Sequence, residues 1–375
     1  MTKIQEIHNF DALTVFKTKH LLYEQQAKLK NPYQFKNKNC LIGIEIEIEN
    51  ITYSLEDALE YYWSETEDHS LRNNGREYKS IPLRAYQIPY CIEYLTDALN
   101  HFNKDYTFSN RCSVHIHLNV RDFTMEQLAC FLLLYCVFEK HFFHVAGTKR
   151  ENNIFCVPLW NTTYVPNLKR ITESVSYKSW HKYLALNCGC IFGSEHNKAF
   201  GTIEFRHLYG TLDTTILYPW INSIIALREA STKYKLNDLV QEIITANTTS
   251  QYLFWYDSIF QDLKIPASLL TKKEHESGIS NLKQNLFSYN NIDNINYFNT
   301  ERNHWFSYNK IKRLPLPKKL QISLDNIDNI VQELLNTQTT ALGAYDTITT
   351  TTVGPGIATA LDFDSVIPID PIQGF

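Results

Sequence analysis

Three short segments of the sequence alternate between apolar and polar residues with the two-residue period of a β-strand. They span residues 41–49, 112–118 and 202–206. In each segment, isoleucine, valine, leucine or phenylalanine occupies one face and chemically active side chains occupy the other. The polar faces together carry Glu45, Glu47, Glu49, His115, His117, Glu204 and Arg206. The pattern predicts a sheet with one apolar face and one face of acids, histidines and an arginine.

Each segment taken alone has an ordinary interpretation. A glutamate-rich strand is usually a solvated sheet face, and a single His-x-His pair is more often structural than metal-binding. Carboxylates at i and i+2 on a strand lie about 6.5–7 Å apart, and no basic residue between Cys40 and Asn50 balances them. Such acids beside an apolar core are unfavourable unless water or a cation neutralises them. The set of segments therefore favours a bound divalent metal.

The residue types also indicate which metal. Thiolate sites favour zinc, but no Cys-x-x-Cys pair occurs, and Cys188 and Cys190 are spaced too closely for ordinary zinc binding. Carboxylates with one or two imidazoles suit Mg²⁺ or Mn²⁺. Mg²⁺ held by carboxylates commonly accompanies nucleotide phosphates, and Arg206 would lie on the same face, placed to contact a phosphoryl group.

Helical spacing predicts further elements around these strands. Amphipathic or apolar helices are expected over 54–63, 87–103, from Thr124 to Gly147, and over 211–230. Thr124 and Gln127 have the spacing of a capping box. Asn74-Gly75 is typical of a hairpin turn, and residues 183–192 and 201–209 read as a strand pair.

These elements divide the chain into four parts. We expect a helical lead-in over 1–40, a catalytic core over 41–235, a helical extension over 236–336 and a low-complexity tail over 337–375. The tail has no lysine or arginine and few bulky residues, so it cannot build a core of its own. We predict that it contacts a protein partner or its own domain and is dispensable for nucleotide chemistry.

Composition narrows the class of protein. The chain has 375 residues and a formal net charge of −4, so bulk electrostatics do not favour nucleic-acid binding. The first residues lack the apolar stretch of a signal peptide. The longest apolar run, 128–138, is shorter than a membrane span and predicts a buried helix. The eight cysteines are scattered, as expected of free thiols in a reducing cytoplasm.

The order of short motifs resembles that of the amidoligase family, a distant branch of the carboxylate–amine ligases built on the glutamine synthetase catalytic fold. The resemblance covers about residues 41–230. It rests on the following sequence of motifs: Gly43-x-Glu45-x-Glu47, Asp68-x-Ser70-Leu71, Gly75-x-Glu77-x-x-Ser80, Ser113-Val114-His115-Ile116-His117, Arg150, Tyr183-x-x-x-Asn187, Thr202-Ile203-Glu204-Phe205-Arg206 and Gly210-Thr211-Leu212-Asp213.

The resemblance implies an α+β fold, with a curved, mainly antiparallel sheet and helices on its outer face. It implies an ATP- and Mg²⁺- or Mn²⁺-dependent ligase that joins a carboxylate to an amine, with a small molecule or peptide as substrate. The implied metal ligands are Glu45, Glu47, Glu77, His115 and Glu204. The implied catalytic residues are Arg206, Arg150, His117 and Asp68, and the implied nucleotide-binding residues are Arg206, Arg150, His117 and Asn187.

Such a ligase would transfer the γ-phosphoryl group of ATP to the carboxylate, and an amine would then displace phosphate from the acyl phosphate. Asp68 is the candidate to take the proton from the amine. Several alternatives stay open. The ligand pair on the first strand is either Glu45 with Glu47 or Glu47 with Glu49. The competing functions are a metal-dependent hydrolase, a guanidine-phosphorylating kinase and a non-catalytic assembly protein.

Overall fold

The computed structural model describes residues 3–7, 33–59, 62–159, 183–193, 199–245 and 249–260. The chain divides into two compact units, Met1–Leu335 and Asn336–Phe375, and every described residue belongs to the first. Most of the expected lead-in, much of the helical extension and all of the expected tail lie outside the described residues.

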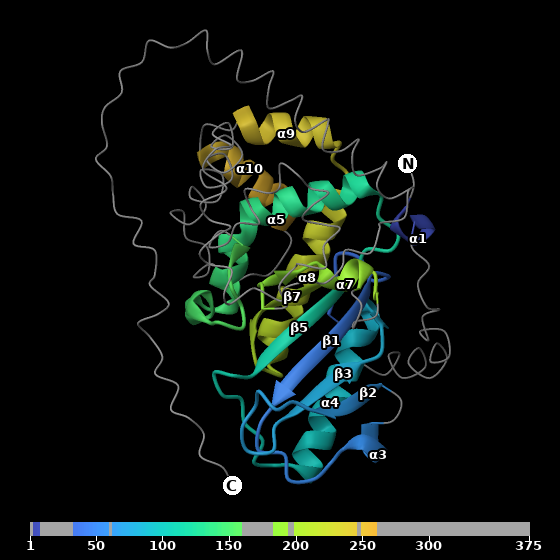
Figure 1. Ribbon diagram of the computed structural model, residues 1–375, viewed down its shortest axis with the longest axis vertical. Coiled ribbons are helices and arrows are strands. Elements are labelled where there is room, and N and C mark those ends of the chain that lie inside the picture. The colour runs from blue at the N-terminus through green and yellow to red at the C-terminus, as the bar shows by residue number, and fades with distance from the viewer. Residues whose placement is uncertain are drawn as a thin grey trace, which may run out of the picture. The chain divides into compact units, whose positions relative to one another are not determined.

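Seven strands in the described part of the chain form one sheet, and all of its ladders are antiparallel. The strands are β1 (Leu41–Ile48), β2 (Trp63–Glu67), β3 (Arg76–Ser80), β4 (Leu83–Arg84), β5 (Ser113–Asn119), β6 (Leu186–Asn187) and β7 (Thr202–Tyr209). Their order is β2-β3-β1-β5-β7-β6, with β4 paired to the start of β1. The alternating segments therefore become the adjacent strands β1, β5 and β7 (Figure 1).

Helices cover the apolar face of this sheet. Ile46, Ile116 and Phe205 are completely buried. The ring of Phe205 meets Phe131 of α5 (Met125–Ala146) and Trp220 of α8 (Thr214–Ser231), with centroids 6.1 and 6.5 Å apart. At the β2 edge of the sheet, the Trp63 indole N–H donates a hydrogen bond to the main-chain carbonyl of Cys91 in α4 (Ile88–Phe102). The expected α+β architecture with an antiparallel sheet is thus confirmed, and the polar face remains for chemistry.

Helix boundaries follow local capping groups. At α5, the Thr124 hydroxyl accepts a hydrogen bond from the main-chain N–H of Gln127. The Gln127 side-chain oxygen accepts one from the main-chain N–H of Thr124, as the capping box predicts. Asp213 caps α8 in a similar way. The helix expected over 54–63 is shorter, because β2 already begins at Trp63. The remaining helices are α1 (Ile4–Ile7), α3 (Glu56–Leu59), α7 (Gly189–Phe192), α9 (Leu236–Thr245), α10 (Thr249–Phe260) and the 3₁₀ turns Ala85–Gln87 and Thr148–Asn152.

Among the described residues, α5 alone is long and apolar enough to span a membrane by length and composition. However, 83% of its apolar window is buried inside the protein. It packs against β7, α8 and α9, which is the environment of a core helix. Glu139 is buried in this helix, and its carboxylate accepts hydrogen bonds from the Tyr135 hydroxyl at 2.8 Å and from the Leu159 main-chain N–H at 2.7 Å, which compensate for its burial.

Candidate metal and phosphate site

The centre of the polar face is Glu45 on β1. Antiparallel pairing sets it directly opposite His115 on β5, and Glu45 Oε2 lies 3.2 Å from His115 Nδ1. Its other oxygen, Oε1, lies 3.2 Å from His117 Nε2. His117 pairs with Gly43, where an added Cβ would lie 3.2 Å from the histidine Cβ. Glycine at this position therefore leaves room for the His117 ring beside the carboxylate.

Strand β7 adds Glu204 and Arg206 to the same face. Glu204 pairs with His117, and its Oε1 lies 3.4 Å from His115 Nδ1. Arg206 forms a close ion pair with this oxygen, and its Nη1 lies 3.4 Å from His115 Nδ1. Asn187 of β6 donates its amide to Glu204 Oε2 at 2.7 Å. Asn187 therefore orients the carboxylate of Glu204.

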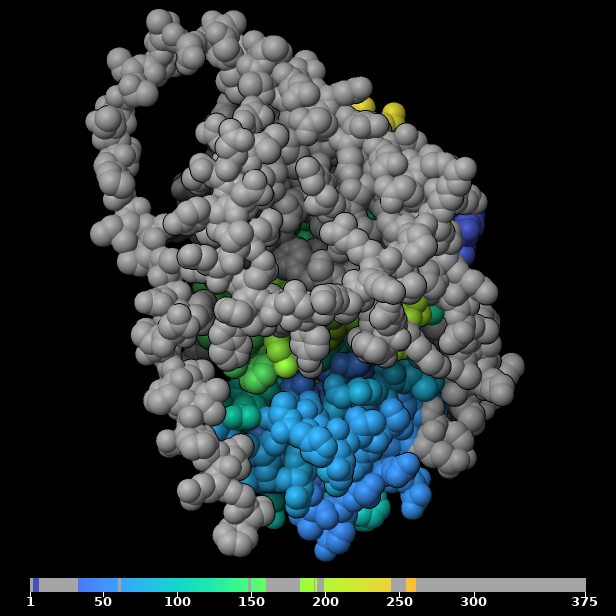
Figure 2. Space-filling model, viewed as in Figure 1, coloured from blue at the N-terminus to red at the C-terminus, as the bar shows by residue number. Residues whose placement is uncertain are grey.

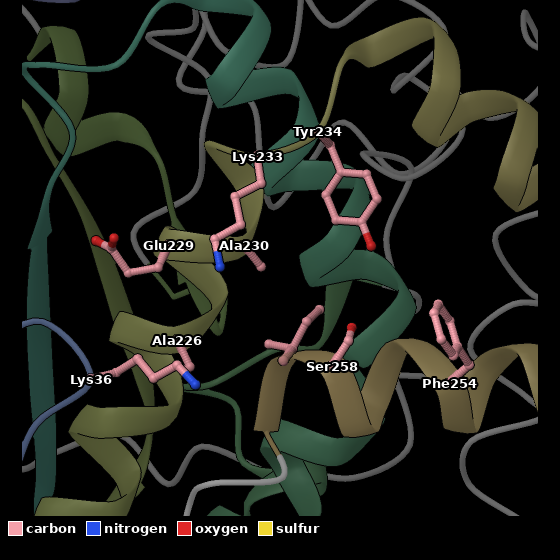
Figure 3. Close-up of a pocket in the computed structure, with 9 residues that line it drawn as sticks. Lys36, Ala226, Glu229, Ala230, Lys233, Tyr234, Phe254 and Ser258 are labelled. Atoms are coloured by element: carbon pink, nitrogen blue, oxygen red, sulfur yellow. The ribbon is translucent and has the colours of Figure 1, made fainter.

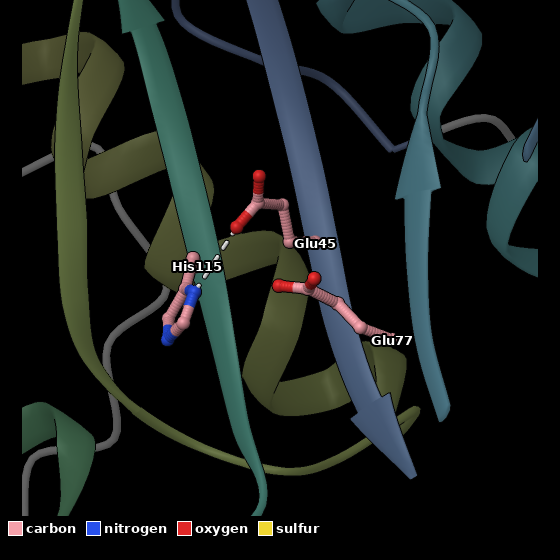
Figure 4. Close-up of side chains that lie close together, drawn as sticks. All are labelled: Glu45, Glu77 and His115. Atoms are coloured by element: carbon pink, nitrogen blue, oxygen red, sulfur yellow. Dashed lines mark hydrogen bonds and ion pairs between the residues drawn. The ribbon is translucent and has the colours of Figure 1, made fainter. Parts of the chain in front are cut away.

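Glu77 of β3 completes the cluster from the far side of β1. The side chains of Glu45, Glu77 and His115 come from three adjacent strands and point toward one another (Figure 4). Within the described residues, two groups place one ligand atom from each member within 4.8 Å of the others. One is Glu45, Glu77 and His115, and the other is Glu45, His117 and Glu204. Glu45 belongs to both groups.

The cluster fixes the charges of its members. Burial opposes ionisation of Glu45, but His117 and His115 outweigh it and hold the pKa of Glu45 well below its usual range. Burial likewise opposes ionisation of Glu204, whose pKa is lowered by Arg206 and the two histidines. Burial, followed by the charge of Glu45, raises the pKa of Glu77. Two carboxylates are thus held as anions at neutral pH, which is what a cation site requires.

Glu47 and Glu49 share the face of Glu45 but have other partners. Glu47 Oε2 accepts from the Ser113 amide N–H at 2.7 Å and from the Ser113 hydroxyl at 2.6 Å. Glu49 accepts from the amide N–H of Arg72 at 2.9 Å, in the loop between β2 and β3. Neither residue belongs to the two groups of potential ligands found in the described residues. The sequence left open whether the ligand pair on this strand is Glu45 with Glu47 or Glu47 with Glu49. Of these three residues, Glu45 alone belongs to the ligand groups found among the described residues.

Arg150 does not point into the cluster of carboxylates. It is buried, and its Nε and Nη2 donate to the main-chain carbonyls of His207 at 2.8 Å and Arg206 at 3.0 Å. At this point the ladder between β5 and β7 has a bulge, because Val114 pairs with Leu208 whereas Ile116 pairs with Phe205. Arg150 therefore binds the bulged main chain that carries Arg206.

Asp68 also lies apart from the ligand groups, in the loop between β2 and β3. Its carboxylate accepts from the amide N–H of Ser70 at 2.8 Å and so stabilises that turn. The loop then passes through Asn73 and Asn74, both with positive φ (51° and 56°), and Gly75 follows at its end. An added Cβ on Gly75 would lie 2.2 Å from the Leu71 Cβ, so glycine is required there.

Three functional neighbours had no role assigned from the sequence. Ser113 bonds both Glu47 and His115, Thr202 Oγ1 lies 3.1 Å from His117 Nδ1, and Lys79 forms an ion pair with Glu77. Each of these three residues lies two positions along its strand from a predicted site residue. The two-residue period that selected the histidines places Ser113 on the same face, and the same spacing joins Lys79 to Glu77.

A separate pocket of about 280 Å³ lies between α8 and α10 (Figure 3). Its lining includes Lys36, Glu229, Lys233 and Ser258, and none of the predicted site residues. Glu229 is already engaged by Arg228 and Asn37, and the Ser258 hydroxyl donates to the Trp255 carbonyl. The two lysines are exposed. The polar groups of this pocket thus have structural roles or face solvent.

In Figure 2 the coloured surface that faces the viewer belongs chiefly to the segment from β1 to β3, in blue.

Comparison with known proteins adds little to this geometry. No family model matches the sequence, and no curated protein matches it. Among solved structures, the chain is similar to one described as a novel glutamine synthase homolog, with 11% sequence identity and a TM-score of 0.30. The alignment covers 65% of this chain and 66% of that one. At this level the similarity supports no conclusion about fold or function.

Proposed function

We propose that this protein is a divalent-metal- and ATP-dependent carboxylate–amine ligase, which forms an amide bond through an acyl phosphate. The observation that carries the proposal is the position of Glu45, which belongs to two ligand groups on one sheet face, next to the guanidinium of Arg206. The order of motifs, which resembles that of the amidoligase family, supplies the reaction class and the glutamine synthetase-like character of the fold.

The donor set fits hard divalent cations. Glu45, Glu77 and His115 would hold one ion, and Glu45, His117 and Glu204 would hold a second. Oxygen-rich sets with a single imidazole suit Mg²⁺ or Mn²⁺ better than zinc. The lowered pKa values of Glu45 and Glu204 keep these ligands anionic at neutral pH. When bound, such cations would neutralise the charge on the phosphates of ATP.

Arg206 is the residue best placed to contact the transferred phosphoryl group. Its side chain is only 15% exposed, and its Nε lacks a hydrogen-bond partner among the described residues. A buried donor without a partner is unfavourable, unless a ligand supplies the acceptor. A guanidinium can bind two phosphoryl oxygens at once, which stabilises the charge that develops during transfer.

The remaining residues act through these groups. Asn187 holds Glu204, Thr202 contacts His117, and Arg150 supports the main chain of Arg206. In the reaction, a carboxylate oxygen would bond to the γ-phosphorus as the bond to ADP breaks. The neutral amine would then attack the acyl carbon, phosphate would leave, and a carboxylate would take the amine proton. Asp68, in the loop beside this face, is our candidate for that proton acceptor.

The test is product analysis with purified full-length protein, Mg²⁺, ATP and a library of carboxylates and amines. A ligase should release ADP only when both metal and a suitable carboxylate are present, and mass spectrometry should detect an amide product. Glu45→Gln should abolish both signals, and EDTA should do the same. ATP-independent hydrolysis of the library, or metal binding without any ADP release, would refute the proposal and favour a hydrolase or a non-catalytic protein.

A further inference from the structure

We propose that Glu47 and Ser113 are positioning residues, which fix the His115 ring so that its Nδ1 atom binds the cation. The inference rests on the proposed metal site. It changes the role expected for Glu47, from a direct ligand to a residue that acts through Ser113 on a neighbouring ligand.

The hydrogen bonds around Ser113 determine where its single hydroxyl proton lies. The Ser113 hydroxyl donates to Glu47 Oε2 across 2.6 Å. The distance from Ser113 Oγ to His115 Nε2 is 2.8 Å. Because the serine proton is already committed to Glu47, Oγ must accept from this nitrogen. His115 therefore carries its proton on Nε2.

The opposite ring nitrogen then presents a lone pair to the centre of the cluster. His115 Nδ1 lies 3.2 Å from Glu45 Oε2 and 3.4 Å from Glu204 Oε1, and both of these atoms are acceptors. Arg206 Nη1, which pairs with Glu204 Oε1, lies 3.4 Å from His115 Nδ1. A guanidinium only donates hydrogen bonds, so this contact also requires a lone pair on Nδ1, and a metal ion would bind at this same lone pair. The tautomer fixed by Ser113 is thus the one that a metal needs at Nδ1.

Burial makes this arrangement specific. Glu47 is 5% exposed and Ser113 is 4% exposed, so solvent has little access to replace either partner. The Ser113 amide N–H donates to the same Glu47 oxygen at 2.7 Å, and this second bond fixes the carboxylate to the strand. Histidine ligands commonly donate their other N–H to a group that orients the ring, and loss of that group typically lowers metal affinity about 10–100-fold. Here the orienting group would be a serine backed by a carboxylate.

A double-mutant cycle on metal affinity tests the inference. Mn²⁺ binding would be measured by calorimetry for the wild type, Ser113→Ala, Glu47→Gln and the double variant, with Glu45→Gln as the direct-ligand comparison. We expect each single variant to bind Mn²⁺ about 10–100-fold more weakly than the wild type. The double variant should bind no more weakly than the single variant with the lower affinity, and Glu45→Gln should lose far more affinity than any of them. Ser113→Thr, which keeps the hydroxyl, should restore affinity. Losses that multiply in the double variant, or a Glu47→Gln loss equal to that of Glu45→Gln, would overturn the inference.

A second readout reports the ring directly and is independent of activity. In ¹⁵N-histidine-labelled protein loaded with Mg²⁺, the His115 signals, assigned from their absence in His115→Asn, should show a protonated Nε2 and an unprotonated Nδ1. Ser113→Ala should weaken this preference while the protein remains folded by circular dichroism. A proton on Nδ1 in the wild type would overturn the inference.

The outcomes separate this inference from the proposed function. If the cycle and the tautomer behave as expected but no carboxylate releases ADP, the positioning role stands and the ligase proposal fails. If ADP is released but the losses multiply, Glu47 is a direct ligand, and the ligase proposal stands. A protein that binds neither Mn²⁺ nor Mg²⁺ would overturn both.

Discussion

Arg206→Lys separates a guanidinium that contacts phosphate from an arginine that merely neutralises a buried acid. In the structure, Arg206 forms a close ion pair with Glu204, while its Nε finds no partner among the described residues. Lysine would preserve the positive charge beside Glu204. It would lose the planar fork that binds two oxygens of one phosphoryl group.

The two roles predict different magnitudes. For folding, the retained charge keeps Glu204 paired, so we expect the free energy of unfolding to fall by about 1.5 kcal/mol, the loss of one charge-assisted hydrogen bond. Arg206→Met, which leaves the buried carboxylate unpaired, should cost about 3–5 kcal/mol. For turnover, removing a donor directed at developing charge should slow ADP release about 10²–10³-fold in the lysine variant.

The assay combines urea unfolding with single-turnover ADP release, using the carboxylate and amine identified by product analysis. Arg206→Lys and Arg206→Met would be compared with the wild type at a temperature where all are folded. The reasoning predicts a lysine variant that is nearly as stable as the wild type but slow. An unchanged rate of ADP release in the lysine variant would assign Arg206 to a structural ion pair with Glu204 and refute the phosphate-contact role.

Three further predictions follow from the same contacts and from the sequence of the tail. Arg150→Met, which removes two charged hydrogen bonds to the bulge of β7, should lower the free energy of unfolding by about 3 kcal/mol, and Arg150→Lys should lower it by less. Equal stability of the wild type and both variants in urea would contradict the supporting role of Arg150. Burial, followed by the charge of Arg150, lowers the pKa of His207 well below 6.5, so at acidic pH the unfolded chain binds a proton that the folded chain does not. The free energy of unfolding should therefore fall as pH drops below about 6.5, by up to about 1.4 kcal/mol per pH unit. His207→Gln should flatten this slope when unfolding is measured as a function of pH. Truncation after Thr337 should leave Mg·ATP affinity unchanged by calorimetry, and a folded but non-binding truncated protein would show that the tail contributes to the site.

The sheet and its faces could be predicted because strand alternation is a local property. Ile44, Ile46, Ile116 and Phe205 are apolar at every second position, and each is completely or almost completely buried. The capping box at Thr124 is local as well, since both partners lie within one helical turn. Local signals of this kind survive folding because the tertiary contacts reinforce them.

The bulge in β7 could not be predicted, because it depends on how β5 and β7 pair. From sequence, Glu204 and Arg206 alternate regularly, and His207 falls on the opposite face. The bulge sets Arg206 and His207 together opposite His115. The His207 ring is completely buried, and its Nε2 lies 2.8 Å from the Tyr135 hydroxyl. The support from Arg150 is equally non-local, since its acceptors are main-chain carbonyls that no side-chain motif records.

The three glutamates of β1 show how far a shared face determines function. Glu45 lies in the middle of two ladders, opposite Lys79 on β3 and His115 on β5. It therefore has a lysine on one side and an imidazole on the other. Glu47 pairs with the acidic Glu77 on one side, and its carboxylate turns to the hydroxyl and amide N–H of Ser113.

Glu49 lies just beyond the end of β1, where its main chain bridges to Thr107 and its side chain accepts from a loop amide N–H. The same residue type on the same face thus has three environments, set by register along the strand. Period-two alternation selects the face but cannot select among these environments. If strand register determines the roles of these glutamates, the same substitution at Glu45 and at Glu47 should have different effects on metal affinity. Glu45→Gln should abolish metal binding, whereas Glu47→Gln should only weaken it, and comparable losses in Mn²⁺ titrations would show that both carboxylates reach the cation.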